Sequence, residues 1–330
     1  MPLSDAYNRT IRDLRISLTD RCNFRCFYCL PHGEPSWAKR EKLLTFEELE
    51  YASEIFVSLG IEKIRLTGGE PLIRRDVPVL VEKLAKLKPR LRDIALTTNG
   101  YDFVRHANAL KSAGLDRVTF SLDSLSREKF IDITGVDGLD RLIDSIGVAK
   151  KLGFSPIKVN AVVVRNRNDD ELVEMARFAR ENALSMRFIE FMPLDSGHDW
   201  SREMVVPGRE IYHKINSVYP LKLKDDSRGS ETAWKYVFAD GTPGEIGIIA
   251  PVTEMFCGAC SRIRLTADGQ IRTCLFSTTE HNLRDLIRSN VSRDEIVSFI
   301  EDAVMKKEPR HSINEPTFVQ PARTMSFIGG

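Results

Sequence analysis

Two groups of three cysteines are the residues of this 330-residue sequence whose type and spacing most clearly predict chemistry. In the first group, Cys22, Cys26 and Cys29 have the spacing C-x3-C-x2-C. Three thiolates on one loop can bind three irons of a cubane cluster and leave the fourth open, whereas electron-transfer clusters ordinarily use four cysteines. An open coordination position distinguishes catalytic from structural metal sites. The spacing therefore predicts a catalytic iron–sulfur cluster.

The second group consists of Cys257, Cys260 and Cys274, and the chain has no further cysteine. It again lacks a fourth thiolate, which predicts an auxiliary cluster with an open iron. Zinc is the alternative for both groups, but a structural zinc site needs a fourth ligand. His32 and His281 are the nearest candidates for that ligand.

Sequence composition favours metal binding over disulfide bonding for the six cysteines. The N-terminus has no secretory apolar stretch, and a chain of 37.4 kDa is large enough to build its own core, so metal ligation is favoured over disulfides. Forty-eight basic and forty-seven acidic residues leave a formal charge of +1, which predicts no nucleic-acid or anionic-membrane partner. The apolar runs have the length of strands and are too short to span a bilayer. We expect a cytoplasmic protein.

Positive side chains form a third chemical signal. Arg262 and Arg264 follow Cys260 directly, and residues two apart on an extended segment face the same side. Paired guanidinium groups suit phosphate, which arginine binds through two hydrogen bonds. Further cations stand at expected strand positions, where charge is costly unless it meets an anion: Arg15, Arg65, Lys158 and Arg187. Solvation or ion pairing on the strands is the alternative. Together they predict one positive site for a polyphosphate.

The elements that must position these residues alternate between strand and helix from residue 13 to about residue 192. The expected strands are 14–18, 63–67, 93–97, 117–122, 157–164 and 186–191. The expected helices are 46–59, 77–87, 103–113, 138–152 and 170–182. This alternation predicts parallel βαβ units, and six units suit a partial barrel better than a closed barrel of eight. In such folds the active site lies at the carboxyl ends of the strands.

The sequence pattern changes after about residue 195. Asp-Gly pairs at 240–241 and 268–269 lie between β-rich runs and predict hairpins. Helices are expected at 283–288 and 294–306, and the segment 309–330 is expected to be irregular. We predict two domains, a barrel over 1–194 and a smaller domain over 195–330.

The first cysteine group, with Tyr28 before its last cysteine and Gly-Gly-Glu-Pro at 68–71, resembles the radical S-adenosylmethionine superfamily. The resemblance implies that the open iron binds the amino and carboxylate groups of S-adenosylmethionine. Electron transfer into the sulfonium then releases a 5′-deoxyadenosyl radical. The residues implied to contact this cofactor are Tyr28, Gly69, Ser121 and Met192.

The two cysteine groups, the Arg-Ile-Arg-Leu run at 262–265 and the terminal Ser-Phe-Ile-Gly-Gly are similar to the GTP 3′,8-cyclase family of molybdenum cofactor biosynthesis. The resemblance covers essentially the whole chain. It implies an α/β fold, an incomplete (βα)6 barrel closed by an α+β C-terminal domain, and two [4Fe–4S] clusters. The residues implied to bind GTP are Arg15, Arg65, Thr97, Lys158, Arg187, Arg262 and Arg264.

The resemblance also implies a reaction. The deoxyadenosyl radical takes hydrogen from C3′ of GTP, and the sugar radical attacks C8 of guanine to give a cyclic dihydroguanosine triphosphate. Arg262, Arg264 and the tail glycines Gly329 and Gly330 are implied to be catalytic. An external electron donor, a pterin-forming synthase that takes the product, and a homodimer are implied as well.

Two other functions stay open at this point. One is a different radical enzyme with an auxiliary cluster, for example one that modifies a peptide; such relatives usually carry more C-terminal cysteines. The other is a non-catalytic iron–sulfur redox protein. The Gly-Gly-Glu-Pro run and the basic positions favour an enzyme.

Overall fold

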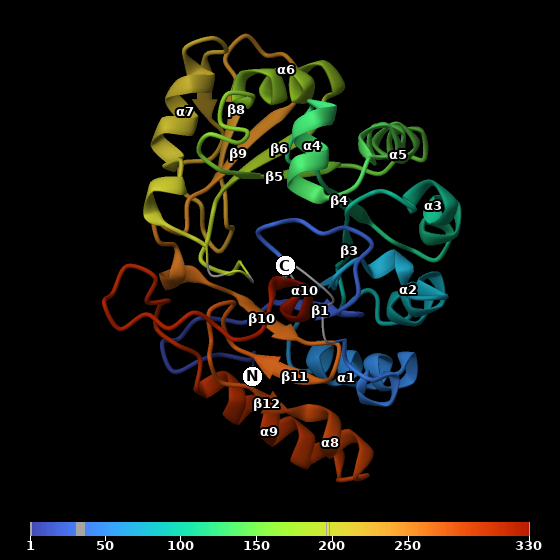
Figure 1. The fold of residues 1–330 in the computed structure, drawn as a ribbon. Helices are drawn as coiled ribbons and strands as arrows, with labels where there is room; N and C mark the ends of the chain where they lie inside the picture. The colour runs from blue at the N-terminus through green and yellow to red at the C-terminus, as the bar shows by residue number, and fades with distance from the viewer. Residues whose placement is uncertain (1, 31–36, 196, 198, 330) are drawn as a thin grey trace.

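A computed structural model describes residues 2–30, 37–195, 197 and 199–329 (Figure 1). Its centre is a run of six parallel strands that neighbour one another in chain order. These strands are β1 (Asp13–Ser17), β2 (Lys63–Thr67), β3 (Asp93–Thr98), β4 (Arg117–Ser121), β5 (Lys158–Val163) and β6 (Ser185–Glu190). The six predicted strands are confirmed, and their ends differ by one residue at most.

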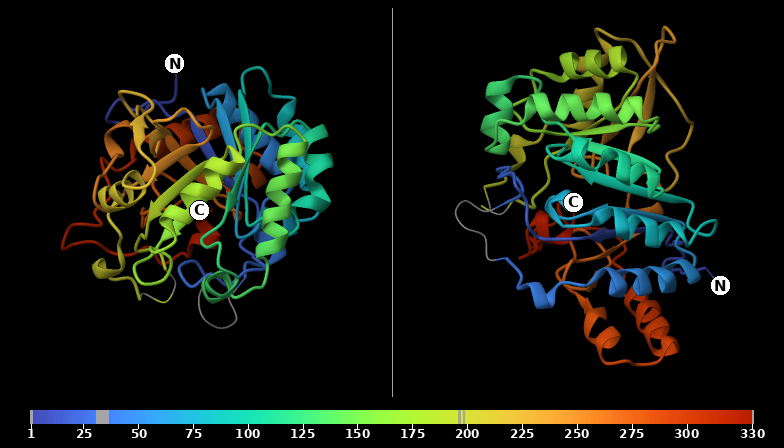
Figure 2. Two further views of the ribbon diagram at one scale, coloured as in Figure 1. Left: turned by 90° about the horizontal axis from the view of Figure 1, so that it is seen from above. Right: turned by 90° about the vertical axis from the view of Figure 1, so that its right-hand side faces the viewer.

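Helices connect the parallel strands and cover the outside of the sheet (Figure 1, Figure 2). They are α1 (Phe46–Ser58), α2 (Val77–Ala85), α3 (Phe103–Ser112), α4 (Arg127–Thr134), α5 (Leu139–Lys151) and α6 (Leu172–Asn182). The helix α4 was not predicted, because its eight residues are too few to show a clear amphipathic repeat before Gly135 ends it in the left-handed region at φ 71°. The connection therefore holds two helices between β4 and β5.

The C-terminal strands extend both edges of the same sheet. Their bounds are β7 (Leu221–Leu223), β8 (Trp234–Phe238), β9 (Glu245–Ile249), β10 (Arg262–Leu265), β11 (Gln270–Arg272) and β12 (His281–Asn282). The full order is β12-β11-β10-β1-β2-β3-β4-β5-β6-β9-β8-β7, so β10 pairs with β1 and β9 pairs with β6. The α/β partial barrel is confirmed, and the part of the chain after residue 195 completes its sheet.

Four further helices belong to the C-terminal part: α7 (Gly208–Asn216), α8 (Leu283–Arg288), α9 (Arg293–Met305) and α10 (Met325–Ile328). Short 3₁₀ turns occur at Arg40–Lys42, Pro71–Ile73, Arg202–Met204 and Cys257–Ala259. Both predicted hairpins form, since β8–β9 and β10–β11 are antiparallel pairs around the Asp-Gly turns. The prediction of a wholly irregular end was wrong at α10, which lies in the middle of the molecule in all three views (Figure 1, Figure 2).

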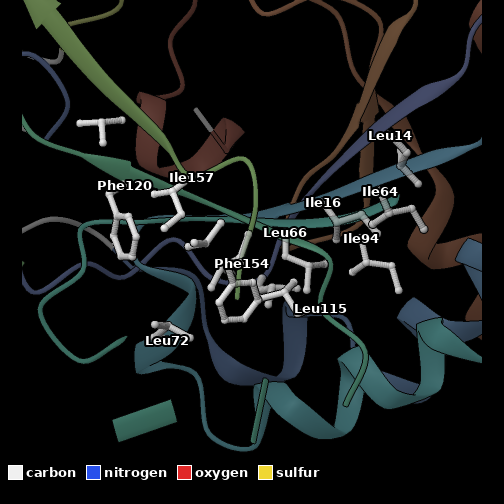
Figure 3. Packing of buried hydrophobic residues seen from close by; sticks show 14 of the residues in the cluster. Leu14, Ile16, Ile64, Leu66, Leu72, Ile94, Leu115, Phe120, Phe154 and Ile157 are labelled. Atoms are coloured by element: carbon white, nitrogen blue, oxygen red, sulfur yellow. The ribbon is translucent and has the colours of Figure 1, made fainter. Parts of the chain in front are cut away.

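The two faces of the parallel strands carry different side chains. Leu14 and Ile16 on β1, and Ile64 and Leu66 on β2, are buried in the core on the side where the helices pack (Figure 3). Since successive residues of a strand point to opposite faces, Arg15 and other alternate residues face the inside of the barrel. No helix among the described residues is long and apolar enough to cross a membrane.

Glu190, the last residue of β6, ties the barrel to the C-terminal part. Its fully buried carboxylate accepts hydrogen bonds from the backbone N–H groups of Gly208, Val252 and Thr253 at 2.8, 2.8 and 2.9 Å. The Thr253 hydroxyl donates to it as well. This one side chain therefore fixes the start of α7 and the loop after β9.

Replacement of Glu190 by alanine is expected to lower the free energy of unfolding by at least about 3 kcal/mol, because buried donors lose a charged acceptor. Chemical denaturation measures this change. Glu301→Ala on the exposed face of α9 is the matched control, and it should change stability by about 0.5 kcal/mol or less. Equal effects of the two substitutions would contradict the role given to Glu190.

Candidate active site

The first cysteine group lies on the loop that follows β1. Cys22, Cys26 and Cys29 are half-buried free thiols, and the Cys29 backbone N–H donates to the Cys26 carbonyl at 3.0 Å. Burial raises the pKa of Cys22 to about 12, and burial together with repulsion between the cysteines raises the pKa values of Cys26 and Cys29. Iron binding removes those protons. Three crowded thiols held on one loop fit a cluster that takes them as thiolates.

The glycine-rich loop after β2 packs directly on the cysteine loop. The backbone N–H groups of Gly69 and Glu70 donate to the Thr19 and Arg21 carbonyls at 2.7 and 2.8 Å. A Cβ atom on Gly69 would lie 2.1 Å from the Arg21 carbonyl oxygen. Only glycine therefore allows the two loops this close approach.

Glu70 organises the neighbouring strand ends. Its buried carboxylate accepts from the Thr98 hydroxyl at 2.8 Å, the Asn99 backbone N–H at 2.7 Å and the Leu72 backbone N–H at 3.0 Å. Burial raises the pKa of Glu70 to about 7. The Asn99 side chain in turn donates to Asn23 at 2.8 Å, inside the cysteine loop. Strands β1, β2 and β3 are thus joined at one edge.

The other residues predicted to contact S-adenosylmethionine come from the same end of the barrel. The Tyr28 hydroxyl donates to Asp123 Oδ2 at 2.5 Å, and Asp123 Oδ1 accepts from the Val162 backbone N–H at 2.8 Å. Ser121 ends β4 beside Asn160 of β5. Met192, which follows β6, packs against a small hydrophobic cluster of the C-terminal part: Val205, Val252 and Ile313. The structure thus brings Tyr28 to the residues that follow β4, whereas Met192 packs against the C-terminal part.

The predicted cations form a layer on the inner face of the sheet. In the strand register Arg15 of β1 stands between Arg264 of β10 and Arg65 of β2. Lys158 of β5 pairs with Thr119, and Thr119 pairs with Thr97 of β3. Arg65 of β2 connects to these strands, because its Nη1 donates to the hydroxyl groups of Thr97 and Thr119 at 3.1 and 3.0 Å.

Most of these cations lack a counter-charge. Within the described residues, no carboxylate lies within ion-pair distance of Arg15, Arg65, Lys158, Arg262 or Arg264. Arg187 has one distant partner, Glu231 at 3.9 Å.

The pKa values reflect this excess of positive charge. Burial, with repulsion from Arg15, lowers the pKa of Arg65 to about 9, and burial, with repulsion from Arg262, lowers that of Arg15 to about 10. Burial, with repulsion from Arg187, lowers the pKa of Lys158 to about 7. Guanidinium groups stay charged near neutral pH, so the layer is built for an anion.

The second cysteine group lies against this layer. Cys257 begins a 3₁₀ turn just before β10, Cys260 follows that turn, and Cys274 follows β11. Burial opposes ionisation of Cys260, but the charges of Arg262 and Lys307 outweigh it and lower the thiol pKa. The buried Lys307 ammonium donates to the Arg262 carbonyl at 3.0 Å and to the Thr273 carbonyl. Burial raises the pKa of Cys274 instead. Cys260, whose thiolate form the neighbouring cations stabilise, fits a cluster ligand.

The zinc alternative finds no further ligand in the structure. His281 lies on β12, where it pairs with Ile271 and stacks edge-on against Phe299, and His32 lies outside the described residues. Among the described residues no three His, Cys, Asp or Glu side chains converge as they must for a single ion. A cubane cluster does not require its cysteines to converge on one point, since each thiolate binds a different iron.

The C-terminal tail reaches the cation layer. Arg264 Nη1 donates to the Gly329 carbonyl, and a Cβ atom on Gly329 would lie 2.5 Å from Thr67 Oγ1. The Ser326 backbone amide faces the Cys29 thiol. Arg323 anchors the tail through two contacts of 2.9 Å to the Asp268 carboxylate. Gly330 lies outside the described residues.

The sequence analysis did not predict three residues of this site. Asp123 holds Tyr28, Lys307 supports the second cysteine group, and Arg323 anchors the tail. Lys307 and Arg323 stand in segments with no strand pattern, so no sequence signal marked them. Asp123 follows a predicted strand end, a position that does point to a site residue.

Comparisons with known proteins place the chain in two steps. The partial barrel with its cysteine loop defines a radical S-adenosylmethionine protein, and a model of the Radical SAM superfamily matches residues 16–179. A crystal structure of Streptococcus suis SuiB bound to S-adenosylmethionine has the same fold, with a TM-score of 0.64 and 15% identity over 92% of this chain and 73% of SuiB.

The second step identifies the family within this superfamily. A model described as Molybdenum Cofactor Synthesis C matches residues 184–313. GTP 3′,8-cyclase of Streptomyces coelicolor is 44% identical over 99% of this chain and 96% of its own length. GTP 3′,8-cyclase 2 of Mycobacterium tuberculosis is 43% identical over 100% and 92%. The chain belongs to the GTP 3′,8-cyclase family.

Proposed function

We propose that this chain converts GTP into (8S)-3′,8-cyclo-7,8-dihydroguanosine 5′-triphosphate, a step of molybdenum cofactor synthesis. The observation that carries the proposal is the row of arginines on three adjacent strands, Arg264, Arg15 and Arg65, which have no carboxylate partner among the described residues. Arg264 lies on β10, which starts two residues after Cys260. Arg15 lies on β1, which leads into the first cysteine loop. A polyphosphate bound to this row would lie along β1 and β10, the two strands that adjoin the cysteine groups.

Different residues of the chain bind the cofactor and the substrate. When bound, the first cluster and S-adenosylmethionine supply the 5′-deoxyadenosyl radical that removes hydrogen from GTP. Gly69, Tyr28, Ser121 and Met192 would contact this cofactor. The cations bind the triphosphate and fix the ribose, and holding base and ribose in one orientation makes the ring closure intramolecular.

The test is a reconstitution without oxygen, with reductant, S-adenosylmethionine and GTP. We expect 5′-deoxyadenosine and a cyclised guanosine triphosphate in parallel. Deoxyadenosine with unchanged GTP would exclude the cyclase and favour a radical enzyme with another substrate, such as a peptide. Neither product, from protein with both clusters intact, would favour a non-catalytic redox protein.

Lys158 gives the proposal a pH dependence. Its pKa of about 7 in the free protein means that the side chain is neutral at pH 8. A bound triphosphate favours the charged form, so GTP binding is expected to take up a proton above pH 7, and affinity falls as pH rises there. The fall is limited to about tenfold per pH unit for one proton.

Calorimetry at pH 8 in buffers of different ionisation enthalpy measures this proton uptake directly. Lys158→Met should bind GTP more weakly and take up no proton. A wild-type protein that binds GTP with no proton uptake at pH 8 would show that Lys158 does not meet the phosphates.

Family membership supports four further proposals. The protein receives electrons from an external donor, passes its product to a pterin-forming synthase, works in the cytoplasm and forms a homodimer. We also propose that residues 1–194 bind S-adenosylmethionine, while residues 195–330 provide the second cluster and the tail. Sedimentation of the reconstituted protein tests the dimer, since a monomer over the working concentration range would exclude it.

A further inference from the structure

Arg228 is a charged side chain that the site described above does not include. It lies on the loop between β7 and β8, and the centre of its guanidinium group is 5.2 Å from the Trp234 ring centroid and 4.9 Å from that of Phe256. Two aromatic faces therefore fix the plane of this guanidinium, as cation–π contacts do. The guanidinium is therefore held in place by the protein itself.

The hydrogen-bonding groups of Arg228 are nevertheless unused. Its Nε and Nη1 atoms are fully buried, and no described residue accepts a hydrogen bond from either. The neighbouring Glu254 carboxylate accepts instead from Trp234 Nε1 at 2.6 Å. Buried donors without acceptors are unfavourable. Nη2 is not among these fully buried atoms, so it is the guanidinium nitrogen that a ligand oxygen can reach.

The position of Arg228 identifies the ligand's chemistry. The guanidinium of Arg262 lies over the same Phe256 ring, 5.4 Å from its centroid, and Phe256 immediately precedes Cys257. Arg262 also donates to the Ser230 carbonyl at 3.2 Å, which holds the Arg228 loop against β10. Two guanidinium groups on one ring repel each other unless an anion joins them, and oxygen atoms of a phosphate fit their planar donor sets.

We propose that Arg228 is a further substrate-binding residue that contacts the phosphate groups of GTP together with Arg262. The inference rests on the proposed function and deepens it. Arg228 extends the cation layer from the inner strands to the loop before β8. It makes recognition depend on the length of the phosphate chain, because a nucleotide with one phosphate lacks the oxygens to reach both the inner arginines and this loop.

The test compares GTP, GDP and GMP in anaerobic binding calorimetry with the reconstituted protein. Arg228→Gln is expected to weaken GTP binding by about 10-fold to 100-fold, the value of hydrogen bonds to a charged group, and to leave GMP binding nearly unchanged. Arg228→Lys keeps the charge without the planar donors and should fall between. Arg105→Gln, an exposed change of equal charge on α3, is the matched control.

The outcomes separate the two proposals. Wild-type protein that binds GTP, with Arg228→Gln binding it equally well, would overturn the role of Arg228 alone. An equal loss for GTP, GDP and GMP would place Arg228 at the base or ribose and overturn the phosphate assignment. Wild-type protein that binds none of the three nucleotides would overturn the proposed function, and this inference with it.

Discussion

Replacement of Gly69 by alanine is expected to lower 5′-deoxyadenosine formation by at least about 100-fold, the cost of misplacing reacting groups by roughly 1 Å. The added methyl group would lie 2.1 Å from the Arg21 carbonyl oxygen and 2.8 Å from that of Asp20. Both contacts are with backbone, so no side chain can rotate away. The loop after β2 must then separate from the cysteine loop.

That separation breaks the two hydrogen bonds from Gly69 and Glu70 to the cysteine loop. It also moves Glu70, whose carboxylate holds the ends of β3 in place. Deoxyadenosine release is measured with S-adenosylmethionine and reductant, and iron content is measured beside it. We expect the loss of activity to persist in molecules that keep both clusters.

Gly147→Ala provides the matched control, since Gly147 lies inside α5 and an added Cβ would meet nothing within 4 Å. This substitution should stabilise the protein slightly, because alanine favours helix over glycine by about 1 kcal/mol. If Gly69→Ala cleaved S-adenosylmethionine as fast as Gly147→Ala, the close contact of the two loops would not matter for catalysis.

The parallel strands and the helices that the sequence predicted are those with strong local patterns. The run Lys63–Thr67 alternates core and inner-face residues, and its bounds were predicted correctly. Thr45 and Glu48 form a capping box at the start of α1, with contacts of 2.7 and 3.2 Å. These features depend on residues close together in the chain, which is why the sequence alone indicates them.

Features that depend on distant segments were not predictable. The pairing of β10 with β1 brings Arg264 beside Arg15 across almost 250 positions of the chain, and no pattern within either strand encodes that register. The same applies to the contact of Lys307 with the second cysteine group and to the stacking of Arg228. The sequence indicated candidate anion-binding residues, and tertiary pairing decides which of them lie side by side.

Replacement of Gly329 by alanine is the second change for which we expect a large effect, and it should separate the two halves of the reaction. Gly329 has φ +80°, which alanine disfavours, and its Cβ would lie 2.5 Å from Thr67 Oγ1 and 3.1 Å from Ser17 Cβ. Both neighbours are buried strand residues that cannot move aside. The tail must shift, and Arg264 then loses its contact with the Gly329 carbonyl.

Gly241→Ala is the matched control, because Gly241 has almost the same φ of +79° but nothing within 4 Å of its added Cβ. Both variants place alanine at nearly the same positive φ, so a difference between them reports chiefly the crowding beside Thr67. We expect Gly329→Ala to form the cyclised nucleotide about 100-fold more slowly, as misplaced reacting groups do, while 5′-deoxyadenosine still forms. A parallel fall of both products would instead show that the tail supports S-adenosylmethionine cleavage itself, through Ser326 beside Cys29. Unchanged cyclisation would show that the tail takes no part, because the residues that remain, Arg15 and Arg264, would then orient GTP without it.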